Sequence, residues 1–72
     1  MGGHMRVLAI ASYSVPLDEI VASLEAMDIK VLEELKNIQG LVLELKPHQP
    51  IDILHKVYGI ISFEEDRPLR AL

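Results

Sequence analysis

The chain has 72 residues, no cysteine, and a net charge of −4 at pH 7 from 7 Lys and Arg against 11 Asp and Glu. This length allows one domain with a small core, and no disulfide can brace that core. The acidic balance has the wrong sign for a protein that binds nucleic acid through its phosphates. No apolar run approaches the length of a membrane span, and no signal peptide is recognisable. We therefore expect one small domain whose partner is neither nucleic acid nor a membrane.

The amino-terminal stretch divides into a short remnant and a first strand. Residues 1–5 resemble a cloning remnant, with Met5 as a possible start, so we expect the folded domain to span 6–66. From Arg6 to Ser12, apolar side chains would cover both faces of a strand. One face would carry Val7, Ala9 and Ala11, and the other would carry Leu8 and Ile10. Apolar residues on both faces predict a central strand.

A helix is predicted after the break at Ser14, Val15 and Pro16. Pro16 suits the first turn of a helix, where its missing N–H costs nothing. Asp18 and Glu19 follow in that turn and interact favourably with the helix dipole. One helical face would carry the apolar side chains of Leu17, Ile20, Val21, Leu24 and Met27.

A hairpin is predicted next. A second strand over 29–36 would have an apolar face of Ile29, Val31 and Leu35, although Glu33 interrupts the pattern. Asn37 and Gly40 would supply the turn, because both residue types tolerate positive φ. The third strand would alternate Leu41, Leu43 and Leu45 with Val42, Glu44 and Lys46.

A short second helix and a last strand complete the predicted order. Ile51, Leu54, Val57 and Tyr58 recur at helical spacing, and Gly59 would terminate that helix. Residues 60–63 then form an apolar strand. The order strand, helix, strand, strand, helix, strand predicts an α+β fold of the ferredoxin-like, split βαβ type. Right-handed crossovers would put both helices on one face of a four-stranded antiparallel sheet and leave the other face bare.

An acidic run closes the last strand. Side chains alternate along a strand, so Glu64 and Asp66 would point the same way and Glu65 the other way. Acidic charge at a strand end often only protects a sheet edge or solvates a turn. Two parallel carboxylates could also cap helices of a partner, because helix N-termini carry free N–H groups and partial positive charge. Apolar and acidic positions would share that face, Ile60 with Glu64 and Val42 with Glu44, which suits a surface that a partner covers.

The carboxyl-terminal segment 67–72 is predicted to leave the domain as an extended tail. Pro68 fixes its own φ and disfavours helix at Arg67. An extended peptide with apolar Leu69 and Leu72 has the form in which many proteases take a substrate, by pairing its backbone as an added strand.

Catalytic and metal-binding interpretations are weak. Ser12, Ser14, Ser23 and Ser62 lack a strained elbow sequence and a neighbouring His, so they are expected to be ordinary capping or surface residues. His48, Asp52 and His55 could share a helix face and hold zinc, but they offer only three ligands, and surface histidines are the simpler interpretation. A pH-sensing role for His55 has no identified partner. We expect no enzyme activity, no cofactor and no metal.

From Arg6 to Leu72 the chain resembles the propeptides of subtilisin-like serine proteases. The stretch 36–41, Lys-Asn-Ile-Gln-Gly-Leu, is similar to the hairpin of that family. The stretch 59–66, Gly-Ile-Ile-Ser-Phe-Glu-Glu-Asp, is similar to its closing strand with the acidic signature and is the more specific match. The resemblance implies a split βαβ domain that inhibits the protease it accompanies and assists its folding.

The resemblance also implies roles for individual residues. The open sheet face would pack on two parallel surface helices of the protease, with Glu64 and Asp66 capping their N-termini. The tail segment Leu69, Arg70, Ala71 and Leu72 would lie in the substrate cleft, with Leu72 in the primary specificity pocket and Leu69 in the pocket three residues back. Leu72 would then be a C-terminus left by self-cleavage, although a free-standing inhibitor fits equally. The protein would be a monomer apart from its protease, with which it would be secreted.

Two other functions remain open at this stage. The first is a small regulatory ferredoxin-like domain that associates with itself through its open sheet and binds a small ligand, although such a domain has no need of an apolar tail. The second is a small metal-binding carrier of the same fold, which lacks the cysteine pair that such a site would use.

Overall fold

The computed structural model describes residues 4–66, and the predicted tail 67–72 lies outside these described residues. The elements follow one another as β1 (Met5–Ala11), α1 (Leu17–Ala26), β2 (Lys30–Leu35), η1 (Lys36–Ile38), β3 (Gly40–Leu45), η2 (Ile51–Lys56) and β4 (Ile60–Glu65). Both η1 and η2 are 3₁₀-helices.

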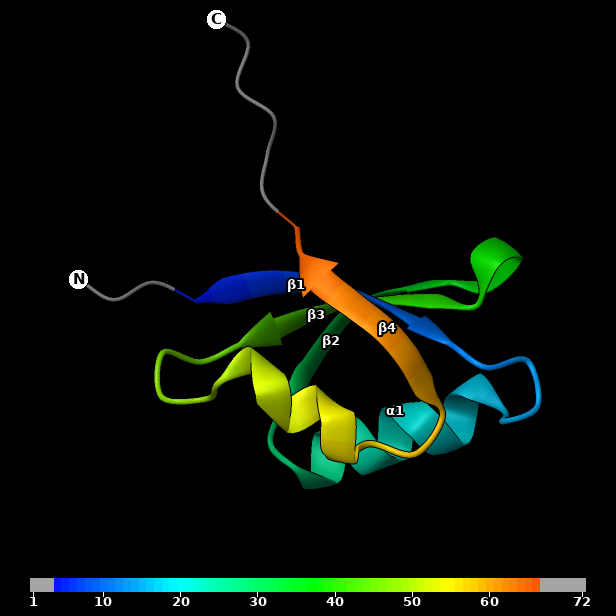
Figure 1. The fold of residues 1–72 in the computed structure, drawn as a ribbon, viewed down its shortest axis with the longest axis horizontal. Helices are drawn as coiled ribbons and strands as arrows, with labels where there is room; N and C mark the ends of the chain where they lie inside the picture. The colour runs from blue at the N-terminus through cyan, green and yellow to red at the C-terminus, as the bar shows by residue number, and fades with distance from the viewer. Residues whose placement is uncertain (1–3, 67–72) are drawn as a thin grey trace, which may run out of the picture.

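The four strands form one sheet in the order β2-β3-β1-β4, with every neighbouring pair antiparallel. The strand β1 is central, as the apolar residues on both faces of 6–12 predicted, and β3 is the other central strand. The helix α1 and the 3₁₀-helix η2 lie on the same side of the sheet (Figure 1). The predicted α+β, ferredoxin-like arrangement is thus confirmed, and one sheet face is covered while the other is open.

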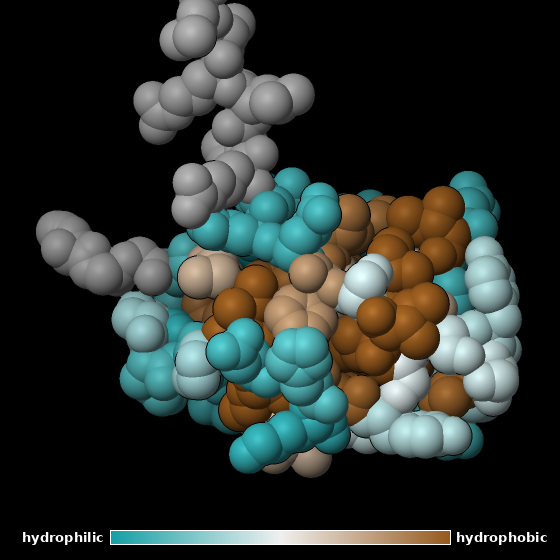
Figure 2. All heavy atoms as spheres, in the orientation of Figure 1, coloured by the Kyte–Doolittle hydropathy of each residue, from teal (hydrophilic) through white to brown (hydrophobic). Residues whose placement is uncertain are grey.

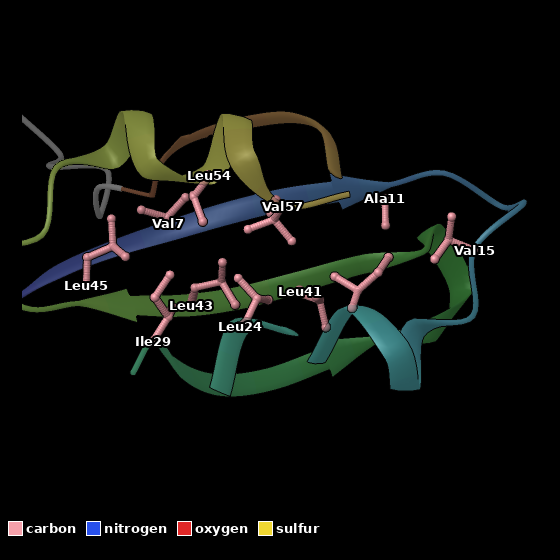
Figure 3. Close-up of a cluster of buried hydrophobic side chains, with 12 residues drawn as sticks. Val7, Ala11, Val15, Leu24, Ile29, Leu41, Leu43, Leu45, Leu54 and Val57 are labelled. Carbon is pink, nitrogen blue, oxygen red and sulfur yellow. The ribbon is translucent and has the colours of Figure 1, made fainter. Parts of the chain in front are cut away.

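The core lies between the sheet and this helical layer. Side chains from β1 and β3 point toward side chains from α1 and η2 (Figure 3). Val7, Leu24, Leu41, Leu43, Leu45 and Leu54 have no exposed surface. The predicted apolar face of α1 packs here, with Ile20 and Leu24 buried and Leu17, Val21 and Met27 partly buried.

The second helix differs from its prediction, because it is a 3₁₀-helix of six residues. Backbone N–H groups of Ile53 and Val57 donate to carbonyls three residues earlier, at Pro50 and Leu54. Six residues are too few for an α-helix to repay the cost of its nucleus. Three residues per turn place Leu54 and Val57 on one side, and both are buried in the core.

Gly59 was predicted to terminate this helix, but η2 ends three residues earlier, at Lys56, and Gly59 lies in the turn before β4 with a φ of 102°. A Cβ on Gly59 would lie 2.9 Å from Cδ1 of Ile20 and 3.3 Å from Cβ of Val15. Glycine is therefore required here for two reasons, the backbone conformation and the close approach of α1.

The hairpin between β2 and β3 corrects the predicted turn. Positive φ falls on Gln39, at 56°, and not on Asn37 or Gly40. The side-chain amide of Gln39 donates to the carbonyls of Ser12 and Val15, both at 3.3 Å, which holds this strained residue in place. Gly40 is instead a strand residue, and the Ile38 side chain would lie 3.2 Å from a Cβ there.

Two β-bulges change which residues share a face. In β2 the register shifts between Val31 and Glu33, so Val31 pairs with Leu43 on the core side whereas Leu35 pairs with Gly40 on the other side. The predicted common face of Val31 and Leu35 is therefore wrong. The interruption by Glu33 in the sequence marks this irregularity.

The second bulge lies in β4, where Ala11 pairs with Ile60 but Ile10 pairs with Ser62. The extra residue, Ile61, is 67% exposed. Ile60 packs against the core, so the prediction that it shares a face with Glu64 is wrong. An inserted residue reverses the alternation of side chains on one side of the bulge.

Candidate functional site

The candidate site is the open face, by which we mean the sheet face opposite the helices. Val7 and Ala9 belong to the core, so their neighbours Leu8 and Ile10 point to the open face. Paired residues on adjacent strands share a face, and the register therefore assigns the remaining members. They are Arg6, Leu8 and Ile10 of β1, Gly40, Val42 and Glu44 of β3, Lys30, Glu33 and Leu35 of β2, and Ser62, Glu64 and, just after the strand, Asp66.

Three rows cross the open face from β2 to β4. The charged row is Lys30, Glu44, Arg6 and Asp66; the middle row is Glu33, Val42, Leu8 and Glu64; and the apolar row is Leu35, Gly40, Ile10 and Ser62. Ile38 packs beside Gly40 and adds to the apolar row. The open face thus changes from charged to apolar along the strands.

The charged row alternates in sign and compensates itself. Glu44 has Arg6 and Lys30 as its two cross-strand neighbours. The Nε of Arg6 lies 3.9 Å from Oδ2 of Asp66, and the Asp66 backbone N–H donates to the Arg6 carbonyl at 2.8 Å. Asp66 is therefore already associated with a cation of its own chain.

The middle row is different, because its two carboxylates flank apolar side chains. Val42, only 7% exposed, and half-buried Leu8 form the centre, with Glu33 on the β2 side and Glu64 on the β4 side. Within residues 4–66 neither Glu33 nor Glu64 forms an ion pair or a side-chain hydrogen bond. Both carboxylates are exposed and uncompensated.

The predicted orientation of the acidic run is confirmed. Glu64 pairs with Leu8 on the open face, Glu65 pairs with Val7 on the helix side, and Asp66 lies beside Arg6. Whether Glu64 and Asp66 cap helices of a partner stays a prediction. Glu33, by contrast, was regarded only as an interruption in a strand, because its face depends on a bulge that the sequence does not reveal.

A shallow hollow of about 230 Å³ lies on the open face beside Glu64. Leu8, Ile10, Ser62 and Phe63 complete its lining. In Figure 2, hydrophilic atoms gather at the end of β4 that leads to Asp66, and hydrophobic atoms lie farther toward its start. The hollow can take a small apolar group next to a carboxylate.

The other candidate residues are not brought into a reactive arrangement. The hydroxyls of Ser12 and Ser14 lie 2.7 Å apart in an exposed loop, and within residues 4–66 no histidine bonds to a serine. The His55 ring packs edge-on against Phe63, with centroids 4.8 Å apart. Across the part of the chain that the structure describes, no three His, Asp or Glu side chains gather as a metal site would require.

Charged groups also line a second hollow, of about 440 Å³, at the carboxyl-terminal end of α1. There the Lys46 ammonium donates to the Asp28 carboxylate, and this hydrogen bond, together with the positive charge, lowers the pKa of Asp28 below its ordinary value of 3.8. This contact joins two loops of the helical layer, and we assign it a structural role.

Comparisons with known proteins give no further guide to the site. No family model, curated protein or solved structure matches this chain. Among the described residues, no helix is long and apolar enough to cross a membrane. The functional argument therefore rests on the open face and on the sequence of the tail.

Proposed function

We propose that this chain is a non-enzymatic inhibitor of a subtilisin-like serine protease, secreted with that protease and assisting its folding. The observation that carries the proposal is the placement of Glu64. It lies on the open face, beside apolar Leu8 and a hollow, on the strand that leads directly into the tail. One binding mode can therefore use the sheet and the tail together.

The open face supplies the first half of this binding mode. Leu8, Ile10 and Leu35 are only partly buried and lie outside the core cluster, so covering their remaining surface would contribute to association and not to folding. Two packed helices lie about 8–10 Å apart, which is about two strand spacings of about 4.8 Å. A four-stranded sheet has three such spacings, so both helices fit within its width. In the proposal such a helix pair of the protease covers the face, and Glu64 and Asp66 accept hydrogen bonds from the free N–H groups at the helix N-termini.

The tail supplies the second half. Residues 67–72 follow Asp66 directly, so the tail starts at the charged end of the open face. In the proposal Leu69 and Leu72 enter apolar pockets of the substrate cleft while the backbone pairs with the cleft as an added strand. A product-like segment held by the folded domain would block the cleft without any chemistry by this chain.

Assistance in folding follows from the same binding. A ligand that binds only the folded form of a protein shifts its folding equilibrium toward that form. The open face would offer a preformed template to the helix pair of the protease. The effect is reciprocal, so we also expect this small domain to become more stable when its protease is bound.

The first prediction concerns deletion of residues 69–72. The core among residues 4–66 is closed without them, so the shortened chain should fold, whereas inhibition should fall by orders of magnitude. The measurement is the inhibition constant against subtilisin with a chromogenic peptide substrate, recorded alongside the circular dichroism spectrum. Leu72→Asp should be nearly as harmful, because burying a carboxylate in an apolar pocket costs several kcal/mol.

Arg70→Ala is the matched control, since residues between anchoring pockets usually contribute little. A folded, shortened chain that inhibits as strongly as the full chain would refute the product-like tail. Failure of the full chain to inhibit the protease at any concentration tested would refute the proposed function itself.

A further inference from the structure

We infer that the partner contacts both edges of the open face, and that Glu33 on β2 is a second acidic contact that pairs with a Lys or Arg side chain of the partner. The inference rests on the proposed function and extends it across the sheet. The acidic run at the end of β4 is evident in the sequence, whereas Glu33 joins the open face only through the bulge in β2.

Charge is distributed differently along the charged row and the middle row of the open face. The charged row holds two cations and two anions, Lys30 and Arg6 against Glu44 and Asp66, so a partner that covers all four meets no net charge. The middle row has two negative ends and no cation among residues 4–66 within ion-pair distance of them. Glu33 and Glu64 are three strand spacings apart, which is about 14 Å.

Covering these carboxylates is costly. A partner that packs on Val42 and Leu8 must remove water from the middle row. Desolvating an unpaired carboxylate is strongly unfavourable unless a cation or several hydrogen-bond donors replace the water. The surface that fits this face therefore has an apolar centre and positive groups on both sides. One side is met by the helix N-termini proposed for Glu64, and a basic side chain meets Glu33.

Aligned packing of a second copy of the chain on this face is disfavoured by charge. Face-to-face packing about a two-fold axis parallel to the strands would place Glu33 of one copy opposite Glu64 of the other. A two-fold axis across the strands would place each of these carboxylates opposite its own counterpart. Like charges opposed at a desolvated interface are destabilising, so both arrangements that bury Val42 and Leu8 are disfavoured.

The test compares adjacent carboxylates on opposite faces of β2. Glu33 pairs with Val42 on the open face, whereas Glu34 pairs with Leu41 on the core side. The side chains of both glutamates are exposed. The variants Glu33→Gln, Glu33→Lys and Glu34→Lys are titrated against subtilisin. Glu33→Lys and Glu34→Lys change the net charge equally, so their difference reports position alone.

We expect Glu33→Gln to weaken inhibition about two- to five-fold and Glu33→Lys about ten-fold or more, because reversal adds repulsion. Glu34→Lys should change it less than two-fold. The difference should shrink in 0.5 M NaCl, since added salt screens exposed charges. Glu64→Ala should weaken inhibition several-fold, and Glu65→Ala should do less.

Equal effects at Glu33 and Glu34, with full inhibition by the unaltered chain, would overturn the inference and leave the proposed function standing. No inhibition by the unaltered chain would overturn both. Sedimentation of the free chain at neutral pH should show a monomer, and a dimer lost in Leu8→Asp would also overturn the inference. Circular dichroism of each variant shows that it is folded.

Discussion

The two faces of this sheet are built from alternate residues of the same strands, yet they differ in what surrounds them. Leu41, Leu43 and Leu45 on the helix side are fully buried under α1 and η2. Val42 and Glu44, between them in the chain, lie on the open face among apolar and charged neighbours. The comparison teaches that the side of the sheet, and not the segment of chain, decides which residues form the core. In the proposed function the open side is the one that binds the protease.

The two faces also differ in their polar contacts. On the helix side, buried Gln49 accepts from the Lys46 N–H at 2.8 Å and donates to the carbonyls of Met27 and Asp28. Gln39 makes similar bonds to the loop before α1. Two glutamines thus attach both ends of α1 to the loops that flank β3. On the open face, Glu33 and Glu64 have no such partners among residues 4–66.

The largest expected effect contrasts neighbouring residues on the two faces. Leu43→Ala should lower the free energy of unfolding by about 2–5 kcal/mol, because it leaves a cavity in the core. A domain of this size has about 4–11 kcal/mol in total, so the variant should be largely unfolded or close to it. Val42→Ala should cost about 1–2 kcal/mol for two methyl groups and should weaken inhibition several-fold.

Urea unfolding followed by circular dichroism measures the free energy of unfolding of each variant. Titration against subtilisin measures its inhibition constant. The separation of roles would be contradicted if Val42→Ala destabilised the domain as much as Leu43→Ala does. It would also be contradicted if Leu43→Ala remained fully folded.

A smaller effect is expected at Gln49, which holds the helical layer in place. Gln49→Ala should cost about 1–3 kcal/mol, because the Lys46 N–H and the Met27 carbonyl lose their glutamine partner and the Asp28 carbonyl keeps only the Lys46 ammonium. The exposed neighbour provides the control, and His48→Ala should stay within about 0.5 kcal/mol of the unaltered chain. Similar urea midpoints for the two variants would show that water replaces the glutamine without cost. Inhibition by either variant should fall only in proportion to the fraction of the chain that is unfolded.

The smallest effect concerns Asp28 and its dependence on pH. The nearby Lys46 lowers the pKa of Asp28 in the folded chain below 3.8, so its contribution to stability is present above that pH. The contribution is lost as the pH falls through the folded-state pKa, because the unfolded chain then binds the proton more readily. The difference in melting temperature between the unaltered chain and Asp28→Asn should therefore shift between pH 6 and pH 2.5.

Only the pH dependence of that difference is informative, since Asp28 has a φ of 64° and asparagine tolerates this conformation well. When Asp28→Asn is made in a chain that already carries Lys46→Gln, the difference in melting temperature that it causes should not shift with pH. A shift of equal size in both backgrounds would mean that Lys46 is not its cause.

Much of the fold could be predicted because the decisive patterns are local. Continuous apolar residues in 6–12 predicted a central strand, and helical spacing after Pro16 predicted α1. Gly59 was expected to terminate the second helix, but η2 ends at Lys56 and Gly59 instead forms the turn before β4. The acidic run was also correctly oriented, since three successive residues at the end of one strand must alternate.

The errors at the hairpin and at the two bulges share one physical cause, which is that contacts with distant parts of the chain decide what the local sequence leaves open. Positive φ at Gln39 is stabilised by bonds to the loop before α1, a contact between residues more than 20 positions apart. The bulges at Leu32 and Ile61 exist only in relation to the strands opposite them.

The sequence by itself determined the order of elements, the apolar content of each, the charge of the acidic run and the composition of the tail. These are properties of neighbouring residues, for which period and propensity are sufficient. Only the tertiary structure decided that Glu33 joins Glu64 on the open face and that Ile60 leaves it. Alternation along a strand tells which of its residues share a face. A bulge adds one residue, and its position depends on pairing with the neighbouring strand. Every residue beyond the bulge then lies on the face opposite to the one that alternation predicts.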